Sequence, residues 1–259
     1  MNEPTSATVD VGGTAIRVLE GGSGPPLLFL HNAVGAGVWT PTHAALATDR
    51  RVLLPDHPGF GTGALPEALD GMEDVVFHYL DLLETIGLRE PVDVVGASLG
   101  GWIAAEIACR HPERFRRMVL IDAAGLRLAE YPIPDVFRLP PHELLPLFFH
   151  DPLKAAPYMP TDLSPGTLVR LFHDRTALAR LAWNPYFHDP KLPGRLRRAT
   201  VPTLVLWGRN DRFLPPVYAE TYQRLLPDAQ LVWIEECGHD PCVEQPDATT
   251  ARIREFLQG

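Results

Sequence analysis

Short apolar runs alternate with amphipathic stretches along most of this chain, and the alternation predicts its architecture. Continuous apolar runs bounded by glycine, proline or charged residues are typical of buried strands, and they fall at residues 27–30, 51–55, 92–95, 118–121, 201–207 and 231–234. Two further strands, at 8–11 and 14–19, are predicted to form a hairpin. Helices are predicted at 72–86, 99–111, 217–226 and 248–257. We therefore expect an α/β fold with a mostly parallel, eight-stranded sheet and helices on both faces.

The regular alternation stops between residues 125 and 199. This segment is rich in proline and aromatic residues, contains helical stretches such as 168–182, and offers no convincing strand. Because a linker of that length would be more polar, we interpret the segment as a helical cap that lies over the sheet edge. The sequence thus predicts a core made of residues 1–124 and 200–259, with the cap, residues 125–199, inserted between them.

The composition and charge of the chain indicate its cellular compartment and exclude some classes of partner. The chain has 259 residues, of which 46% are hydrophobic, so it can bury a substantial core. Its formal net charge of -9 disfavours nucleic acid and anionic membrane surfaces as partners. The sequence offers neither a cationic, apolar leader nor an apolar run long enough to span a bilayer, so we expect a cytoplasmic protein. The sequence leaves open whether the chain forms a homodimer.

The three cysteines, Cys109, Cys237 and Cys242, are an odd number and lack the spacing of a zinc site. This pattern indicates neither a disulfide framework nor a metal centre. We interpret the three residues as small apolar side chains of the core.

One stretch carries the candidate chemistry, because Gly96-Ala97-Ser98-Leu99-Gly100 joins a predicted strand to a predicted helix. Small residues on both sides of Ser98 allow a sharp, strained turn that lifts the hydroxyl above the sheet edge. The helix that begins at Leu99 directs free backbone N–H groups towards that hydroxyl, where they can stabilise a developing oxyanion. Ser98 is therefore the candidate nucleophile.

A serine hydroxyl needs a base to remove its proton, and histidine titrates in the useful range. Histidines that follow predicted strands on the side of the serine are His31, His57 and His239. Asp211 also lies in the turn after a late strand. The chain order Ser98, Asp211, His239 fits a triad assembled from the strand ends of one sheet, with His239 as the base.

These motifs together make the chain similar to the α/β-hydrolase fold family. The matching segments follow the order and spacing of the family and span nearly the whole core; they are His31-Asn32 and residues 56–61, 96–101, 207–211, 238–239 and 244–246. The resemblance implies that Ser98 is the nucleophile, that His239 is general base and then acid, and that Asp211 orients it. It also implies an oxyanion hole formed by the backbone amides of Leu99 and Ala33.

Some family members place the acid at the end of the preceding strand, where this chain has Asp122. Asp211 is the preferred assignment, and Asp122 stays as the alternative acid or as a structural residue that anchors the cap. His31 is interpreted as a buried, hydrogen-bonded histidine under the oxyanion loop, and His57 as a residue that shapes the site.

The substrate pocket is expected to draw on both the core and the cap. Asn32 departs from the family, which usually has glycine after the histidine of this loop, and its side chain is a candidate pocket group. The remaining candidates are aromatic, namely Trp102, Phe148, Trp183 and Phe213.

Two kinds of hydrolase fit the resemblance. Residues 207–213 and 237–239 resemble the branch that cleaves carbon–carbon bonds in ring-fission products of aromatic degradation. Other marks of that branch are missing, and Asp240 stands where it has tryptophan. We therefore expect a serine hydrolase for a small hydrophobic or aromatic carboxylic ester, with carbon–carbon bond hydrolysis as the alternative. Acyl transfer of this kind needs a small-molecule substrate and neither a metal nor an organic cofactor.

The alternative from another class is a catalytically silent ligand-binding protein on the same scaffold, because a fold does not fix a function. An intact set of serine, histidine and aspartate argues against it.

Overall fold

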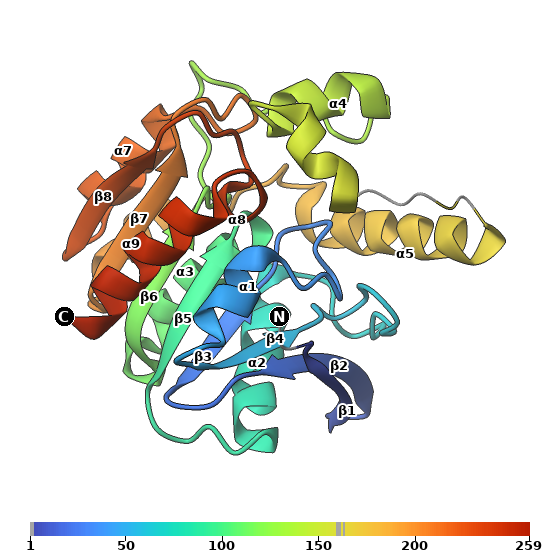
Figure 1. Ribbon diagram of the computed structural model, residues 1–259, viewed down its shortest axis with the longest axis vertical. Helices are drawn as coiled ribbons and strands as arrows, with labels where there is room; N and C mark the ends of the chain where they lie inside the picture. The colour runs from blue at the N-terminus through green and yellow to red at the C-terminus, as the bar shows by residue number, and fades with distance from the viewer. Residues whose placement is uncertain (1–2, 159–161, 163) are drawn as a thin grey trace.

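One mixed sheet forms the centre of the computed structural model, which describes residues 3–158, 162 and 164–259 (Figure 1). Its eight strands lie in the order β1-β2-β4-β3-β5-β6-β7-β8. They are β1 (Thr5–Val11), β2 (Thr14–Gly21), β3 (Pro26–Leu30), β4 (Arg51–Pro55), β5 (Val92–Ala97), β6 (Phe115–Ile121), β7 (Thr203–Gly208) and β8 (Ala229–Ile234). β2 pairs antiparallel with β1 and β4, and the remaining neighbours are parallel. The predicted α/β class with a mostly parallel sheet is confirmed.

Helices cover both faces of this sheet (Figure 1). One face carries α1 (Pro41–Leu46) and α9 (Pro246–Gln258), and the other carries α2 (Met72–Thr85), α3 (Leu99–Arg110) and α7 (Val217–Leu225). The strands serve both layers because successive side chains point to opposite faces. Leu27 and Phe29 of β3 belong to the core under α1 and α9, whereas Leu28 and Leu30 belong to the core under α2 and α3.

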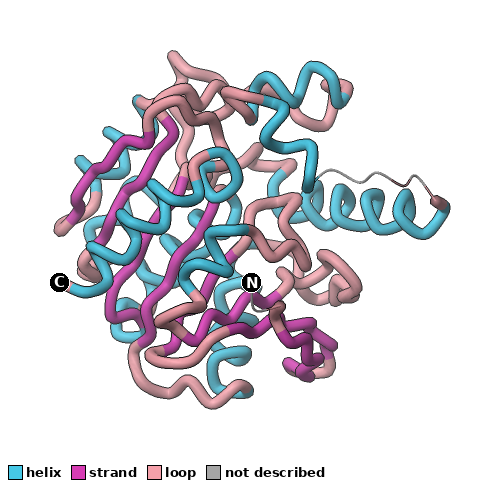
Figure 2. The backbone as a smooth tube through the Cα atoms, in the orientation of Figure 1, coloured by secondary structure: helices cyan, strands magenta, loops and turns pink. Residues whose placement is uncertain are grey.

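The chain between β6 and β7 is helical. Its elements are α4 (Pro141–Phe148), η2 (Pro152–Tyr158), α5 (Pro165–Ala182), α6 (Leu192–Arg195) and η3 (Leu196–Arg198), and Figure 2 shows helix and loop there. Within its described residues the segment adds no strand to the sheet, only isolated bridges such as Gly125 with His188. A helical insertion, here called the cap, is therefore present between β6 and β7. Its role as a cap over the sheet edge and the limits of 125–199 for the cap and of 1–124 and 200–259 for the core stay predictions.

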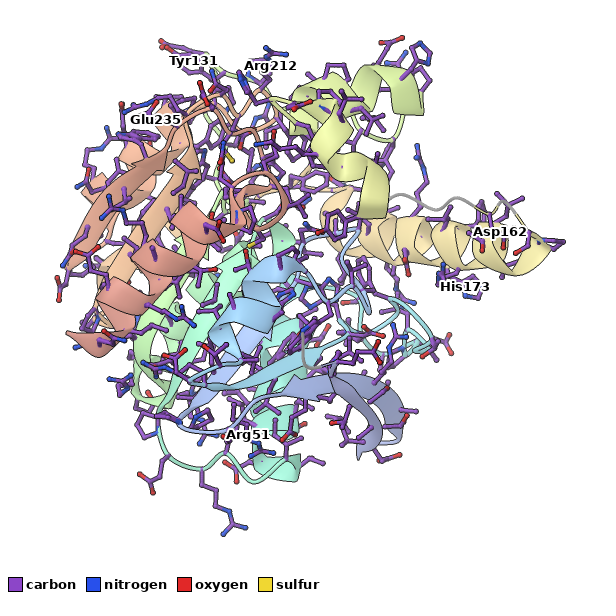
Figure 3. All side chains as sticks on the ribbon, viewed as in Figure 1. Arg51, Tyr131, Asp162, His173, Arg212 and Glu235 are labelled. Atoms are coloured by element: carbon purple, nitrogen blue, oxygen red, sulfur yellow. The ribbon has the colours of Figure 1, made fainter. Side chains whose placement is uncertain are left out.

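α5 projects away from the sheet, and only its last turns are buried (Figure 1). His173 lies on this helix with an exposed side chain, far from the sheet (Figure 3). None of the described helices combines the length and apolarity that crossing a bilayer requires. The short elements η1 (Pro112–Arg114) and α8 (Pro241–Glu244) complete the connections around β6 and β8.

Candidate active site

Ser98 lies in a strained turn between β5 and α3. Its backbone has φ 52° and ψ -110°, a region that a non-glycine residue adopts only when the surroundings enforce it. The enforcing contacts are hydrogen bonds from Ser98 N–H to the carbonyl of Ile121 (2.8 Å) and from Ala124 N–H to the carbonyl of Ser98 (3.1 Å). Close packing adds to them, because a Cβ on Gly96 would lie 2.4 Å from the carbonyl oxygen of Gly100. The turn therefore holds the Ser98 hydroxyl at the carboxyl edge of the sheet.

A continuous series of hydrogen bonds joins Ser98, His239 and Asp211. Nε2 of His239 lies 2.8 Å from Oγ of Ser98, and Nδ1 lies 2.7 Å from Oδ2 of Asp211. The three residues are only 4%, 6% and 3% exposed, respectively. Because an ionised carboxylate can only accept, Nδ1 carries a proton, and the lone pair of Nε2 faces the serine hydroxyl.

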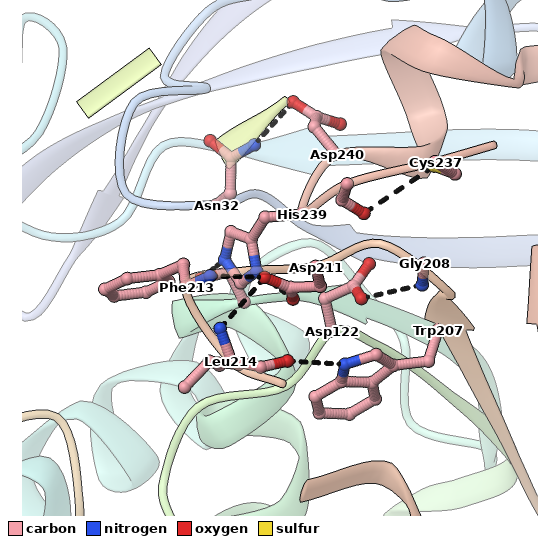
Figure 4. A network of polar contacts seen from close by, with 12 residues as sticks. Asn32, Asp122, Trp207, Gly208, Asp211, Phe213, Leu214, Cys237, His239 and Asp240 are labelled. Carbon is pink, nitrogen blue, oxygen red and sulfur yellow. Dashed lines mark hydrogen bonds and ion pairs between the residues drawn. The ribbon is translucent and has the colours of Figure 1, made fainter. Parts of the chain in front are cut away.

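Asp211 is held by the turn that follows β7. Its Oδ1 accepts hydrogen bonds from the backbone N–H groups of Phe213 (2.8 Å) and Leu214 (2.9 Å), which leaves Oδ2 for His239 (Figure 4). The carboxylate thus has a fixed rotamer that also fixes the orientation of the imidazole.

Asp122, the alternative acid, lies against the same group. Its Oδ1 accepts a hydrogen bond from Gly208 N–H (2.9 Å), and no hydrogen bond joins it to His239. Its carboxyl, that of Asp211 and the ring of His239 each place one atom within 4.8 Å of the others. The structure thus brings Asp211 to the imidazole and Asp122 to the side of Asp211.

This cluster has donor atoms that could hold a metal ion, but its spacing is that of hydrogen bonding. Oδ2 of Asp211 and Nδ1 of His239 face each other at 2.7 Å, the distance of an N–H···O hydrogen bond. We therefore assign Asp122, Asp211 and His239 as hydrogen-bonding groups.

A chain of buried hydrogen bonds fixes the peptide between Asn32 and Ala33. His57 N–H donates to Nε2 of His31 (3.0 Å), so the proton of the His31 ring is on Nδ1, which donates to the carbonyl of Asn32 (2.5 Å). Burial lowers the pKa of His31 to about 4, which keeps this ring neutral. His57 in turn donates from Nε2 to the carbonyl of His31 (2.8 Å) and accepts at Nδ1 from the hydroxyl of Tyr79.

This arrangement sets the direction of the Ala33 N–H. In a trans peptide the C=O and the following N–H point in opposite directions, so a carbonyl of Asn32 held by His31 turns the amide of Ala33 away from that ring. The N–H of Leu99 opens α3 directly after Ser98. Within the described part of the chain, neither of these two N–H groups has an acceptor.

Asn32 meets Asp240 across the site. Its Nδ2 donates to Oδ2 of Asp240 (3.1 Å), and its Oδ1 accepts from the N–H of Val34 (3.0 Å) (Figure 4). Burial raises the pKa of Asp240 to about 6; the charge of His239 opposes that shift, and the carboxylate of Glu244 adds to it. Asn32, which stands where the resembled family usually has glycine, is therefore in contact with Asp240, which stands where its carbon–carbon bond hydrolases have tryptophan.

The aromatic candidates for the pocket separate into two groups. The ring centroid of Phe148 lies 5.4 Å from that of His239, and the ring of Phe213 lies 4.9 Å from it. Trp102 is 2% exposed and packs within α3, where its Nε1–H donates to Glu106 (3.1 Å). Trp183 is 52% exposed and packs edge-on against a ring of the cap. Phe148 and Phe213 thus come to the imidazole, and the two tryptophans make other contacts.

Glu244 has a part in the site to which the sequence analysis gave no specific role. Its Oε2 accepts from the N–H of Gly238 (2.6 Å) and its Oε1 from the N–H of Asp151 (2.8 Å). The N–H of His239 donates to the carbonyl of Phe148 (2.6 Å). The loop that carries His239 is therefore connected to the cap twice, through the side chain of Glu244 and through the backbone of His239. The signal for it in the sequence was its place in the segment 244–246, which matches the resembled family.

The cysteines, all within the described part of the chain, are buried and unpaired. Burial raises the pKa of the Cys237 thiol, and the nearby carboxylates of Glu244 and Asp240 raise it further. The thiols of this site are therefore protonated at neutral pH, which suits small apolar side chains rather than nucleophiles.

Comparisons with known proteins agree with this architecture. Residues 27–252 match the model of the alpha/beta hydrolase family, and the chain therefore belongs to that family. It is 31% identical to the 2-hydroxymuconate semialdehyde hydrolase of Pseudomonas sp. strain CF600, over 95% of this chain and 91% of that protein. It is 28% identical to the pimeloyl-(acyl-carrier protein) methyl ester esterase of Nitrosospira multiformis, over 96% and 100%.

Among solved structures, a membrane phospholipase A described as a bacterial virulence factor matches with a TM-score of 0.82 and 29% identity. The match covers 99% of this chain and 86% of that one. The family resemblance seen in the motifs is thus confirmed, and the protein is an α/β hydrolase.

Proposed function

We propose that the protein is a serine hydrolase that cleaves a small hydrophobic or aromatic carboxylic ester through Ser98, His239 and Asp211. The observation that carries the proposal is the hydrogen-bond series from Ser98 Oγ to Nε2 of His239 (2.8 Å) and from Nδ1 to Asp211 (2.7 Å). A base within hydrogen-bond distance of a nucleophile, itself oriented by a third group, is the arrangement that acyl transfer requires.

In the mechanism, His239 takes the proton of Ser98 as Oγ attacks the ester carbonyl carbon. The negative charge that develops on the carbonyl oxygen is held by the N–H groups of Leu99 and Ala33. The protonated His239 gives its proton to the leaving alcohol, and the acyl group stays on Ser98. Water then attacks the acyl-enzyme with His239 again as base, which releases the acid and restores the serine.

The alternative is hydrolysis of a carbon–carbon bond, which the similarity to 2-hydroxymuconate semialdehyde hydrolase favours. The charge near the site favours the ester. A muconate-type substrate carries a carboxylate, and Asp240 lies directly after His239 and in contact with Asn32 of the proposed oxyanion loop. Because the pKa of Asp240 is about 6, this carboxyl is negative at neutral pH and repels an anionic substrate.

The deciding assay compares p-nitrophenyl esters of short and long acyl chains with a ring-fission dienoate. We expect turnover of the esters, and a loss of about a millionfold in kcat for Ser98→Ala and His239→Ala. Ser23→Ala, which removes an exposed serine hydroxyl, serves as the matched control and should keep full activity. A fluorophosphonate probe should label the wild-type protein and leave Ser98→Ala unlabelled.

Equal ester turnover by the wild-type protein and Ser98→Ala contradicts the proposal. Turnover of the dienoate alone favours carbon–carbon bond cleavage. Tight binding of an ester without turnover or labelling favours a catalytically silent binding protein.

A further inference from the structure

The second carboxyl of the site, Asp122, has an oxygen atom that the hydrogen bonds described above leave unused. Asp122 is fully buried, and its Oδ1 accepts from Gly208 N–H (2.9 Å). Its Oδ2 is buried and has no donor among the described residues (Figure 4). A carboxylate oxygen buried without a donor costs free energy on the order of a lost hydrogen bond or more, so an ionised Asp122 fits these surroundings poorly.

A second carboxyl, that of Asp211, lies close to the carboxyl of Asp122. Asp122 and Asp211 each place an oxygen within 4.8 Å of the other and of His239. Asp211 is supplied with donors, since Phe213 and Leu214 bind one oxygen and His239 binds the other. Two acids at this separation resist a second negative charge, so one of them keeps a proton.

The surroundings indicate which acid that is. Burial raises the pKa of Asp122 well above its usual range, and the negative charge of Asp211 raises it further, whereas the bond from Gly208 N–H opposes the shift. The other ionisable groups near Asp122 are Asp240, Cys237 and Cys242, which are neutral or negative, and His239, whose Nδ1–H is bonded to Asp211.

We propose that Asp122 is a neutral carboxylic acid that donates its proton to Asp211 and thereby acts as a positioning residue for it. The proposal deepens the proposed function and rests on it, because Asp211 acts there through His239. The shared proton gives the buried carboxyl of Asp122 a hydrogen-bond partner and adds a further donor to Asp211. It also leaves the pair with one negative charge, located on the acid that faces the imidazole.

The backbone of Asp122 supports this geometry. Its φ of 44° is in the left-handed region, and its N–H donates to the carbonyl of Leu206 in β7 (3.1 Å). The turn thus holds the carboxyl between the ends of β6 and β7, beside the turn that carries Asp211. Asparagine adopts such a backbone readily, so Asp122→Asn retains the local fold.

The test compares Asp122→Asn with Asp122→Ala. In Asp122→Asn, the amide oxygen can still accept from Gly208 and the amide N–H can still donate to Asp211, so kcat for the ester should stay within about threefold of wild type. Asp122→Ala removes the donor, and kcat should fall roughly 10- to 100-fold with KM nearly unchanged. A loss in Asp122→Asn as large as that in Asp211→Asn overturns the proposal, because it means that Asp122 works as an anion.

The proton itself gives a readout that needs no turnover. The infrared spectrum of the wild-type protein at pH 7 should contain the C=O stretch of a protonated carboxylic acid that is missing in Asp122→Asn. Absence of that difference overturns the proposal even if Asp122→Ala fails to fold. Failure of the proposed function is seen separately, as ester turnover that does not depend on Ser98, and it leaves the infrared result valid.

Discussion

At the scale of single residues, the proposed reaction of Ser98 depends on the tautomer of His239. Oδ2 of Asp211 accepts from Nδ1–H, and this bond keeps the lone pair of Nε2 directed at the serine hydroxyl. Asp211 is kept in place by the N–H groups of Phe213 and Leu214 and not by a counter-charge. A change of one atom at Asp211 is therefore expected to alter the chemistry while the packing stays the same.

Asp211→Asn makes that change. The new amide N–H2 faces Nδ1 and favours the ring form in which Nε2 carries the proton, so kcat should fall by on the order of 10⁴-fold, as for a triad acid replaced by its amide elsewhere. Ester kinetics measure the loss of kcat. A thermal unfolding curve close to that of the wild type shows that the packing is unchanged. If Asp211→Asn keeps its activity and Asp122→Asn loses it, Asp122 is the acid.

Tyr79, His57 and His31 show how residues of other elements contact the proposed oxyanion loop at Asn32 and Ala33. Each buried ring nitrogen of the two histidines has a partner, and the order of donors runs from the Tyr79 hydroxyl to the carbonyl of Asn32. His31 under this loop and His57 at the site could be expected from the sequence, whereas Tyr79 of α2, at the end of the series, could not.

At the scale of elements, the approach of α3 to β3 depends on the absence of a side chain. A Cβ on Gly100 would lie 2.1 Å from the carbonyl oxygen of Leu30, a contact that only a shift of the helix or the strand could relieve. The same turn carries Ser98, and therefore the position of this proposed nucleophile depends on the packing of α3.

Gly100→Ala should accordingly lower the free energy of unfolding by about 1–3 kcal/mol or more, because overpacking forces the backbone apart. Gly166→Ala is the matched control: Gly166 is also in a helix, α5, but nothing lies within 4 Å of its added Cβ. Alanine there should be neutral or stabilising by up to about 1 kcal/mol. Urea unfolding of both variants measures the difference, and equal stabilities contradict the expected clash.

The long elements could be predicted from the sequence because their periodicity is strong. The helix predicted at 72–86 is α2 (Met72–Thr85), and the strand predicted at 51–55 is β4 (Arg51–Pro55). The short helices α1 and α8 were missed, since six or four residues do not establish a period of 3.6. In the cap, α4 contains Pro146, which masks the helical pattern.

At the scale of the whole molecule, the candidate triad could be predicted because its members follow strands, and parallel strands bring their ends to one edge. The contact of Asn32 with Asp240 could not, since it joins loops 208 residues apart whose paths no local pattern defines. The unused oxygen of Asp122 depends likewise on how β6 and β7 lie side by side. The local sequence therefore indicated the candidate residues of the site, and the tertiary fold determined which of their polar atoms meet.

The same tertiary burial makes stability depend on pH through Asp240. Its pKa rises from 3.8 to about 6 on folding, so the folded protein binds the proton more tightly than the unfolded chain. The stabilising contribution of the protonated Asp240 is complete below pH 3.8 and is lost as the pH rises through about 6.

Relative to Asp240→Asn, the wild-type free energy of unfolding should therefore fall between pH 3.8 and about pH 6 by at most about 3 kcal/mol. Urea unfolding from pH 4 to 8 measures the difference, with Asp70→Asn, which removes an exposed carboxylate, as the control for net charge. If the wild-type protein instead becomes more stable than Asp240→Asn as the pH rises, the expectation that ionised Asp240 destabilises the folded protein is wrong.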